Sequence, residues 1–170
     1  MVLPDEIGKT VMKDSRRYWL FKSEPSCFSF NDLENRPGRI EPWDGVRNYQ
    51  ARNFLRDEIR PGDGVLFYHS GIPRPAVVGT AVVVRGGYPD LTALDPESDG
   101  YDPRSTPDVP IWYRVDIRAE KPFAREVTLE EIRRHPLLAD MVLLHRSRLS
   151  IQPVAEDAWK VILGLGGVVG

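Results

Sequence analysis

The sequence has little of what most catalytic and metal-binding sites need. Its 170 residues include one cysteine, Cys27, and three histidines. A single cysteine excludes an internal disulfide and any multi-cysteine metal site, and the histidines lie far apart, without zinc-ligand spacing. Neither a G-x-S-x-G motif nor a G-x-x-x-x-G-K-[ST] motif is present. We expect no catalytic residue, metal or cofactor, although a Ser-His-Asp triad would form only in the fold.

Long apolar runs are also missing. No stretch approaches the roughly 20 apolar residues of a membrane-spanning helix. The N-terminus, "MVLPDEIGKTVMKDSRR", lacks the apolar segment of a secretory signal. The sequence therefore predicts a cytoplasmic monomer without a membrane partner. We expect residues 1–17 to be a polar tail, 18–166 a single domain and 167–170 a short C-terminal tail.

Net charge is small, and it is unevenly distributed. The total is −2 at pH 7, while Asp95–Asp108, "DPESDGYDPRSTPD", alone holds five acidic residues and one arginine. The remainder of the chain is therefore mildly basic. This pattern argues against an extended electrostatic footprint on duplex DNA, but it is compatible with a small local nucleic-acid site.

Hydrophobic patterning predicts an α+β domain. Aromatic and β-branched runs predict strands at Tyr18–Ser23, Gly64–Ser70, Ala76–Arg85, Ile111–Phe123 and Arg148–Val154. Capping residues and apolar spacing predict helices over residues 29–35 and 48–59, from Thr128 onward, and in the C-terminal "AEDAWKVILGLGG". Several strands with helices between them indicate a small curved sheet or barrel.

The segment Trp43–Phe54, "WDGVRNYQARNF", joins a large aromatic residue to amides and arginines. Recognition of a single nucleobase needs a flat aromatic surface and polar groups at the edge of the base. Base–aromatic stacking contributes about 1–3 kcal/mol. We therefore predict Trp43 as the stacking surface, with a core position as the alternative.

Polar residues near this segment and near the first strand are candidates for the base edge. Lys22 and Ser23 end a strand just before Pro25, where polar groups would lie at the mouth of a barrel. Asn48 offers both a donor and an acceptor, or it caps the following helix. Glu24 is expected to accept from an exocyclic amine or to pair with an arginine.

Arginines and further aromatic residues complete the predicted site. Arg47 and Arg52 are candidates for phosphate contacts, although Arg52 could also belong to a solvated helix face. Arg148 adds a second basic position. Tyr49 is ambiguous, and of the strand neighbours Phe67 and Tyr68 we expect one to line the pocket and the other to fill the core.

Four motifs carry a resemblance to a known family. They are "YWLFKSEP" (18–25), "WDGVRNYQARNF" (43–54), "GDGVLFYHS" (62–70) and "RLSIQPV" (148–154). In this order they resemble the EVE domain family, from Tyr18 to about Leu165. Ser70 and Ser150 become candidate site residues through these motifs, and a likeness to YTH domains places Lys22, Ser23 and Trp43 at the pocket.

The resemblance implies a PUA-like curved β-barrel flanked by helices, in a superfamily that includes the YTH and SRA domains. Those domains read modified bases in RNA or DNA. The implied function is recognition of a modified base in single-stranded or flipped-out nucleic acid, without catalysis. Two alternatives are an enzyme that acts on a nucleotide or small cyclic ligand in the same pocket, and a protein-interaction module that has kept the fold.

Overall fold

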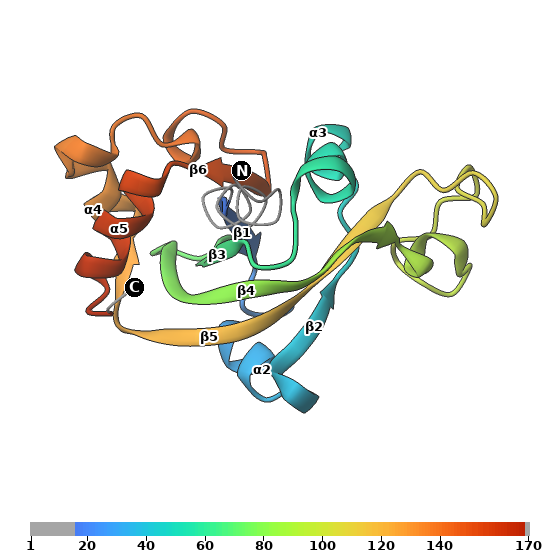
Figure 1. Cartoon of the computed structure of the whole chain (residues 1–170), viewed down its shortest axis with the longest axis horizontal. Helices are drawn as coiled ribbons and strands as arrows, with labels where there is room; N and C mark the ends of the chain where they lie inside the picture. Colours follow the sequence, from blue (N-terminus) through green and yellow to red (C-terminus); the bar gives the residue numbers. More distant parts are fainter. Residues whose placement is uncertain (1–15, 169–170) are drawn as a thin grey trace, which may run out of the picture.

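A six-stranded mixed sheet forms the centre of the computed structural model, which describes residues 16–168 (Figure 1). The strands are β1 (Tyr18–Ser23), β2 (Ile40–Trp43), β3 (Gly64–His69), β4 (Ala76–Pro89), β5 (Tyr113–Thr128) and β6 (Ile151–Val154). The helices are α2 (Phe30–Glu34), α3 (Tyr49–Asn53), α4 (Leu129–Arg134) and α5 (Glu156–Leu165). Most of the predicted N-terminal tail, and residues 169–170 of the C-terminal one, lie outside the described residues.

The strand order is β2-β5-β4-β3-β1-β6. Only β1 and β3 run parallel among these neighbours. The long strands β4 and β5 bend where their register shifts, at four places between Val77 and Tyr88, as bulges do. β2 and β6 are the two edges of the described sheet. The α+β class is confirmed, but the sheet is open, so the closed barrel implied by the resemblance is not confirmed.

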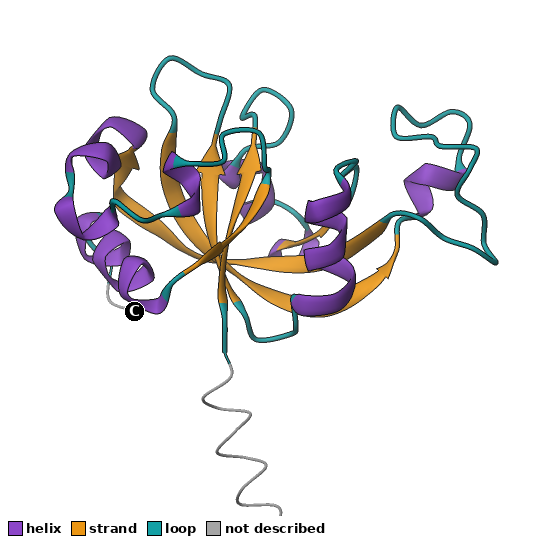
Figure 2. Cartoon of the chain, turned by 90° about the horizontal axis from the view of Figure 1, so that it is seen from above, coloured by secondary structure: helices purple, strands orange, loops and turns teal. Residues whose placement is uncertain are grey.

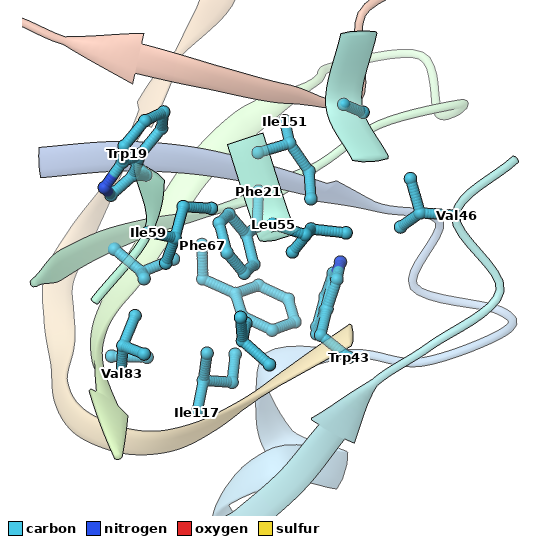
Figure 3. Packing of buried hydrophobic residues seen from close by; sticks show 14 of the residues in the cluster. Trp19, Phe21, Trp43, Val46, Leu55, Ile59, Phe67, Val83, Ile117 and Ile151 are labelled. Atoms are coloured by element: carbon cyan, nitrogen blue, oxygen red, sulfur yellow. The ribbon is translucent and has the colours of Figure 1, made fainter. Parts of the chain in front are cut away.

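Both faces of the sheet are buried. Side chains alternate along a strand, so Trp19 and Phe21 enter one apolar cluster while Leu20 enters a second. Helices α2 and α3 contribute to the first cluster, which Figure 3 shows, and α4 and α5 contribute to the second. Between β4 and β5, residues 90–112 form an arm that projects beside α3, away from the rest of the domain (Figure 2).

Two segments differ from the prediction. Strand β2 was missed because it has four residues and includes Pro42, which is tolerated at the edge of a sheet. The helix predicted over 48–59 ends at Asn53 and continues as a π-helical turn, Phe54–Glu58. The N–H of Ile59 closes this turn by donating to the Phe54 carbonyl at 2.8 Å. The five predicted strands are present, Tyr18–Ser23 with the predicted bounds and the other four with shifted ends.

Asp63 connects the start of the domain to the end of this π-helical segment. Its buried carboxylate accepts from the Trp19 indole N–H at 2.9 Å, and from the backbone N–H groups of Arg60 at 3.0 Å and Arg17 at 3.2 Å. One side chain therefore satisfies three donors, and one of these donors belongs to a fully buried tryptophan.

Replacement of Asp63 by alanine should lower the free energy of unfolding by roughly 2–4 kcal/mol, because the buried indole N–H loses its acceptor. Urea denaturation followed by tryptophan fluorescence measures the change. Asp63→Asn keeps one acceptor oxygen and should fall between the wild type and Asp63→Ala. A loss below about 0.5 kcal/mol for Asp63→Ala, the range of neutral surface changes, would contradict this role.

Candidate functional site

A cavity of about 500 Å³ opens between the segment that follows β1, strand β2 and the segment that leads into α3. Small-molecule sites are typically about 300–1,000 Å³. The lining residues are Lys22, Ser23, Glu24, Cys27, Phe28, Arg36, Glu41, Pro42, Trp43, Asp44, Gly45, Val46, Arg47 and Ser150.

Half of the predicted binding residues line this cavity. They are Lys22, Ser23, Glu24, Trp43, Arg47 and Ser150. The cavity lining does not include the other half: Asn48, Tyr49, Arg52, Phe67, Ser70 and Arg148. The fold thus brings together residues from the N-terminal strand, from the segment around Trp43 and from the start of the last strand.

Trp43 belongs both to the core and to the cavity wall. Only 8% of its surface is exposed, and its ring centroid lies 5.3 Å from that of Phe21 and 5.5 Å from that of Phe67 (Figure 3). Its indole N–H has no hydrogen-bond partner within residues 16–168, and the nitrogen lies on the side of the ring toward Val46. In this arrangement Trp43 offers a ligand a small part of its ring and a free donor.

Polar groups of two kinds lie where β1 ends and β6 begins. Lys22 and Ser23 already donate within the protein, to the Ser147 carbonyl at 2.7 Å and to the Phe28 carbonyl at 2.6 Å. Burial lowers the pKa of the Lys22 amine. The Glu24 carboxylate and the Ser150 hydroxyl, in contrast, have no partner in the described part of the chain. These two side chains are therefore open to a ligand.

Arg47 is committed to the protein itself. Its guanidinium donates to the Gly100 carbonyl at 2.7 and 3.1 Å, to the Val46 carbonyl at 3.0 Å, to Asp90 Oδ2 at 2.9 Å and to Thr92 Oγ1 at 3.2 Å. An arginine side chain has five N–H donors, and these contacts use all of them. We call these five hydrogen bonds the Arg47 clamp. The predicted phosphate contact would require some of them to break.

Asp90 is the buried partner of that clamp, and its side chain has no exposed surface. Burial alone would raise the pKa of Asp90. Hydrogen bonds from Thr92, Gly45 and Arg47 outweigh that effect and hold the pKa below its usual value. The carboxylate therefore stays charged, and Arg47 is the cation that balances it.

Three predicted residues belong to α3 or to its N-cap and do not line the cavity. Asn48 Oδ1 accepts from the Ala51 N–H at 2.9 Å, which makes Asn48 the N-cap of α3. Tyr49 stacks on Trp112 with 4.9 Å between centroids. Arg52 donates to the Ile111 carbonyl at 2.7 Å and lies 5.1 Å from the Tyr49 ring.

The remaining three predicted residues lie behind or beside the cavity. Phe67 is fully buried in the first cluster, behind Trp43, and Tyr68 is buried in the second cluster. Neither residue lines this cavity, although one of the two was expected to line the pocket. Ser70 donates its backbone N–H to the Ser23 carbonyl at 3.0 Å. Arg148 is exposed, and no ion pair or hydrogen bond of its side chain occurs within residues 16–168.

Phe28, Arg36 and Asp44 also line the cavity, although the sequence did not identify them as binding residues. Arg36 lies 5.1 Å above the Phe28 ring and pairs with Glu41 at 3.0 Å. Burial, with the nearby Asp90, raises the pKa of Asp44. The sequence carries no signal for Phe28 and Arg36, because they reach the cavity through a turn and a short helix after β1.

The described residues hold neither a candidate metal site nor a candidate membrane-spanning helix. No group of three histidine, cysteine or acidic side chains that could hold a metal ion occurs in residues 16–168. Over the same range, no helix has both the length and the apolar character to cross a membrane.

Comparison with known proteins identifies the family. The EVE domain model matches residues 17–165. Thymocyte nuclear protein 1 of Mus musculus is 38% identical over 90% of this chain and 75% of the relative, and an uncharacterized protein of Schizosaccharomyces pombe is 41% identical over 88% and 68%. The structure of human THYN1 protein in complex with 5-methylcytosine containing DNA has a TM-score of 0.85 at 36% identity, covering 91% of this chain and 99% of that one. This chain belongs to the EVE domain family.

Replacement of Asn48 by alanine should lower the free energy of unfolding by about 1 kcal/mol, because the Ala51 N–H loses its cap. Asn48→Ser keeps a capping oxygen and should stay within a few tenths of a kcal/mol of the wild type. Thermal unfolding measures both variants. If the serine variant is as unstable as the alanine variant, capping is not what Asn48 contributes.

His69 makes the contact between the end of β3 and the start of α2 sensitive to acid. Its Nε2 accepts from the Phe30 N–H at 3.1 Å, at the start of α2, and burial lowers the pKa of the imidazole below its ordinary 6.5. The unfolded chain then binds the proton more readily, so this stability is complete above pH 6.5 and is lost as the pH falls through the folded-state pKa.

We expect the free energy of unfolding of the wild type to fall more steeply between pH 7 and pH 5 than that of His69→Gln. Glutamine keeps an acceptor but has no proton to bind. Urea titrations of both proteins across this range isolate the contribution of His69. Parallel pH profiles would exclude it.

Proposed function

We propose that this domain binds DNA that carries a modified cytosine and holds the modified base, flipped out of its stack, in the cavity beside Trp43. The observation that carries the proposal is the composition of the cavity, in which aromatic walls, a free carboxylate and a free hydroxyl share about 500 Å³. The likeness to human THYN1 in complex with 5-methylcytosine containing DNA supports DNA as the nucleic acid. We also assign the open sheet to the PUA-like class.

The free groups of the cavity suit the edge of a cytosine. The exocyclic amine of cytosine is a donor, and the unpaired Glu24 carboxylate is an acceptor that lines the cavity. The indole N–H of Trp43 and the hydroxyl of Ser150 provide donors for the ring carbonyl. Phe28 and Val46 give apolar surface for a methyl group. A modified or mismatched base also costs less to extrude from a duplex.

Of the three arginines that the sequence predicted, Arg148 remains for a phosphate contact. Arg47 is fully hydrogen-bonded, and Arg52 holds the Ile111 carbonyl. Arg148 is exposed without a partner among the described residues, close in sequence to Ser150 of the cavity lining. Contacts to phosphate position a nucleic acid but do not read its sequence, so Arg148 is assigned to overall affinity and the cavity to discrimination.

The test compares short DNA duplexes and single strands that contain one 5-methylcytosine or one cytosine in the same sequence. Fluorescence titration at low salt should show roughly tenfold tighter binding of a methylated form, since one methyl group in a fitted pocket contributes about 1–3 kcal/mol. Glu24→Gln, which turns half of the acceptor edge into a donor, should weaken binding of both oligonucleotides. Trp43→Phe should reduce the preference for methylcytosine.

Conservative variants are needed because Trp43 is also a core residue. Trp43→Ala would cost about 3–5 kcal/mol of stability, and loss of binding would then report unfolding. Trp159→Phe is the matched control, since Trp159 is equally buried but lies in the second cluster with α5. Equal binding of methylated and unmethylated DNA by the wild type, or full discrimination by folded Trp43→Phe, would refute the proposal.

A further inference from the structure

A second, smaller cavity shares Arg47 with the first cavity. It measures about 310 Å³ and is formed by α3 and the projecting arm. Its lining residues are Arg47, Tyr49, Asp99, Gly100, Tyr101, Asp102, Arg104 and Trp112. Arg47 also lines the first cavity. The two cavities therefore share one wall, and that wall is fixed by the five hydrogen bonds of Arg47.

Exposed aromatic surface is concentrated at this second cavity. Tyr49 is 51% exposed and Tyr101 is 43% exposed, and both line this cavity. Tyr49 is held in place because it stacks on Trp112 at 4.9 Å, and Arg47 lies 5.4 Å from the Trp112 ring. We call Tyr49 and Tyr101 the aromatic shelf, and Tyr49 is the member that Trp112 holds in place.

At the second cavity, one acidic residue of the arm, Asp102, is neutralised by an ion pair with Arg104. Asp102 accepts from Arg104 at 2.8 and 3.0 Å and from the Trp112 indole N–H at 2.8 Å. The Arg104 side chain remains 65% exposed. Asp95, Glu97 and Asp108 do not line the cavity. Each arginine of the lining already has a carboxylate partner, Arg47 with Asp90 and Arg104 with Asp102. Arg47 uses all five of its donors, so a phosphate group at this position would meet the remaining N–H donors of Arg104, beside one acid, Asp99, that has no partner among the described residues.

We propose that the second cavity binds the nucleotide next to the one held in the first cavity. Its base stacks on Tyr49 and Tyr101, and Arg104 contacts the adjoining phosphate. This inference rests on the proposed function. Because Arg47 lines both cavities, neighbouring nucleotides of one nucleic-acid chain would occupy them. Stacking on aromatic side chains tolerates any base, so the second cavity contributes affinity and strand path without sequence preference.

The experiment uses the full chain and three single-stranded pentanucleotides with one 5-methylcytosine at the 5′ end, at the centre or at the 3′ end. The double variant Tyr49→Ala/Tyr101→Ala should bind the central form roughly tenfold more weakly than the wild type, or about 1.4 kcal/mol. The loss of affinity should persist when the 5-methylcytosine is at one end of the pentanucleotide and disappear when it is at the other end. Only one of the two nucleotides that flank a central 5-methylcytosine would reach Tyr49 and Tyr101.

The control is Val109→Ala, which removes an apolar side chain of the same arm that is 67% exposed and lies outside the cavity. It should bind all three pentanucleotides as the wild type does. Arg104→Gln should reduce the salt dependence of binding by about one phosphate contact. Circular dichroism confirms that each variant is folded.

The two proposals fail in different ways. If the folded double variant binds all three pentanucleotides as tightly as the wild type, the second cavity does not hold a nucleotide, while a retained preference of the wild type for 5-methylcytosine leaves the first proposal standing. If the wild type itself shows no preference for 5-methylcytosine over cytosine in any position, the proposed function fails and this inference falls with it.

Discussion

The parallel pairing of β1 with β3 fixes the position of the cavity and the division of the core into two clusters. Its register places Ser23 opposite His69, so both strands end at the same rim. The carboxyl ends of parallel strands are where open α/β sheets hold their ligands, and the same geometry here places Lys22 and Ser23 at the cavity. It also fixes the alternation by which Trp19, Phe21 and Phe67 face one cluster and Leu20 and Leu66 the other.

The Arg47 clamp shows how a charged residue in a polar motif can be structural. Five donors and one buried carboxylate fasten the segment after β2 to the projecting arm. Without this clamp, Asp90 would be a buried charge with no cation, which is strongly destabilising. The wall of the first cavity, the arm and the aromatic shelf are therefore connected through Arg47 and Trp112. A displacement of one of them should displace the other two.

Much of the fold followed from local patterns in the sequence. The strand Tyr18–Ser23 and the caps Ser29, Asn48 and Thr128 were predicted because each signal lies within a few residues. Strand β2 was missed because its stability comes from pairing with β5, more than 70 residues away. The openness of the sheet was also not predictable, since it depends on which edges meet after the bends in β4 and β5.

The site was predictable to the extent that its residues sit in one motif or at one strand end. Lys22, Ser23, Glu24 and Trp43 were found in this way. Arg47 and Asn48 have the residue types of a base-binding site, but their hydrogen bonds run inward, and sequence does not record the direction of a side chain. Phe28 reaches the cavity only because the chain turns after Pro25, with its N–H donating to the Glu24 carbonyl at 2.9 Å.

In the proposed function, Trp43 connects stability with recognition. A side chain that is 8% exposed and surrounded by Phe21, Phe28 and Phe67 cannot swing toward a ligand without opening the core. Interiors are close-packed, so such a wall keeps its shape. A rigid wall is what discrimination of one methyl group requires, because that selectivity depends on close fit. In the proposed function, the burial that leaves little of the Trp43 ring for stacking therefore favours selectivity, because it keeps the cavity wall rigid.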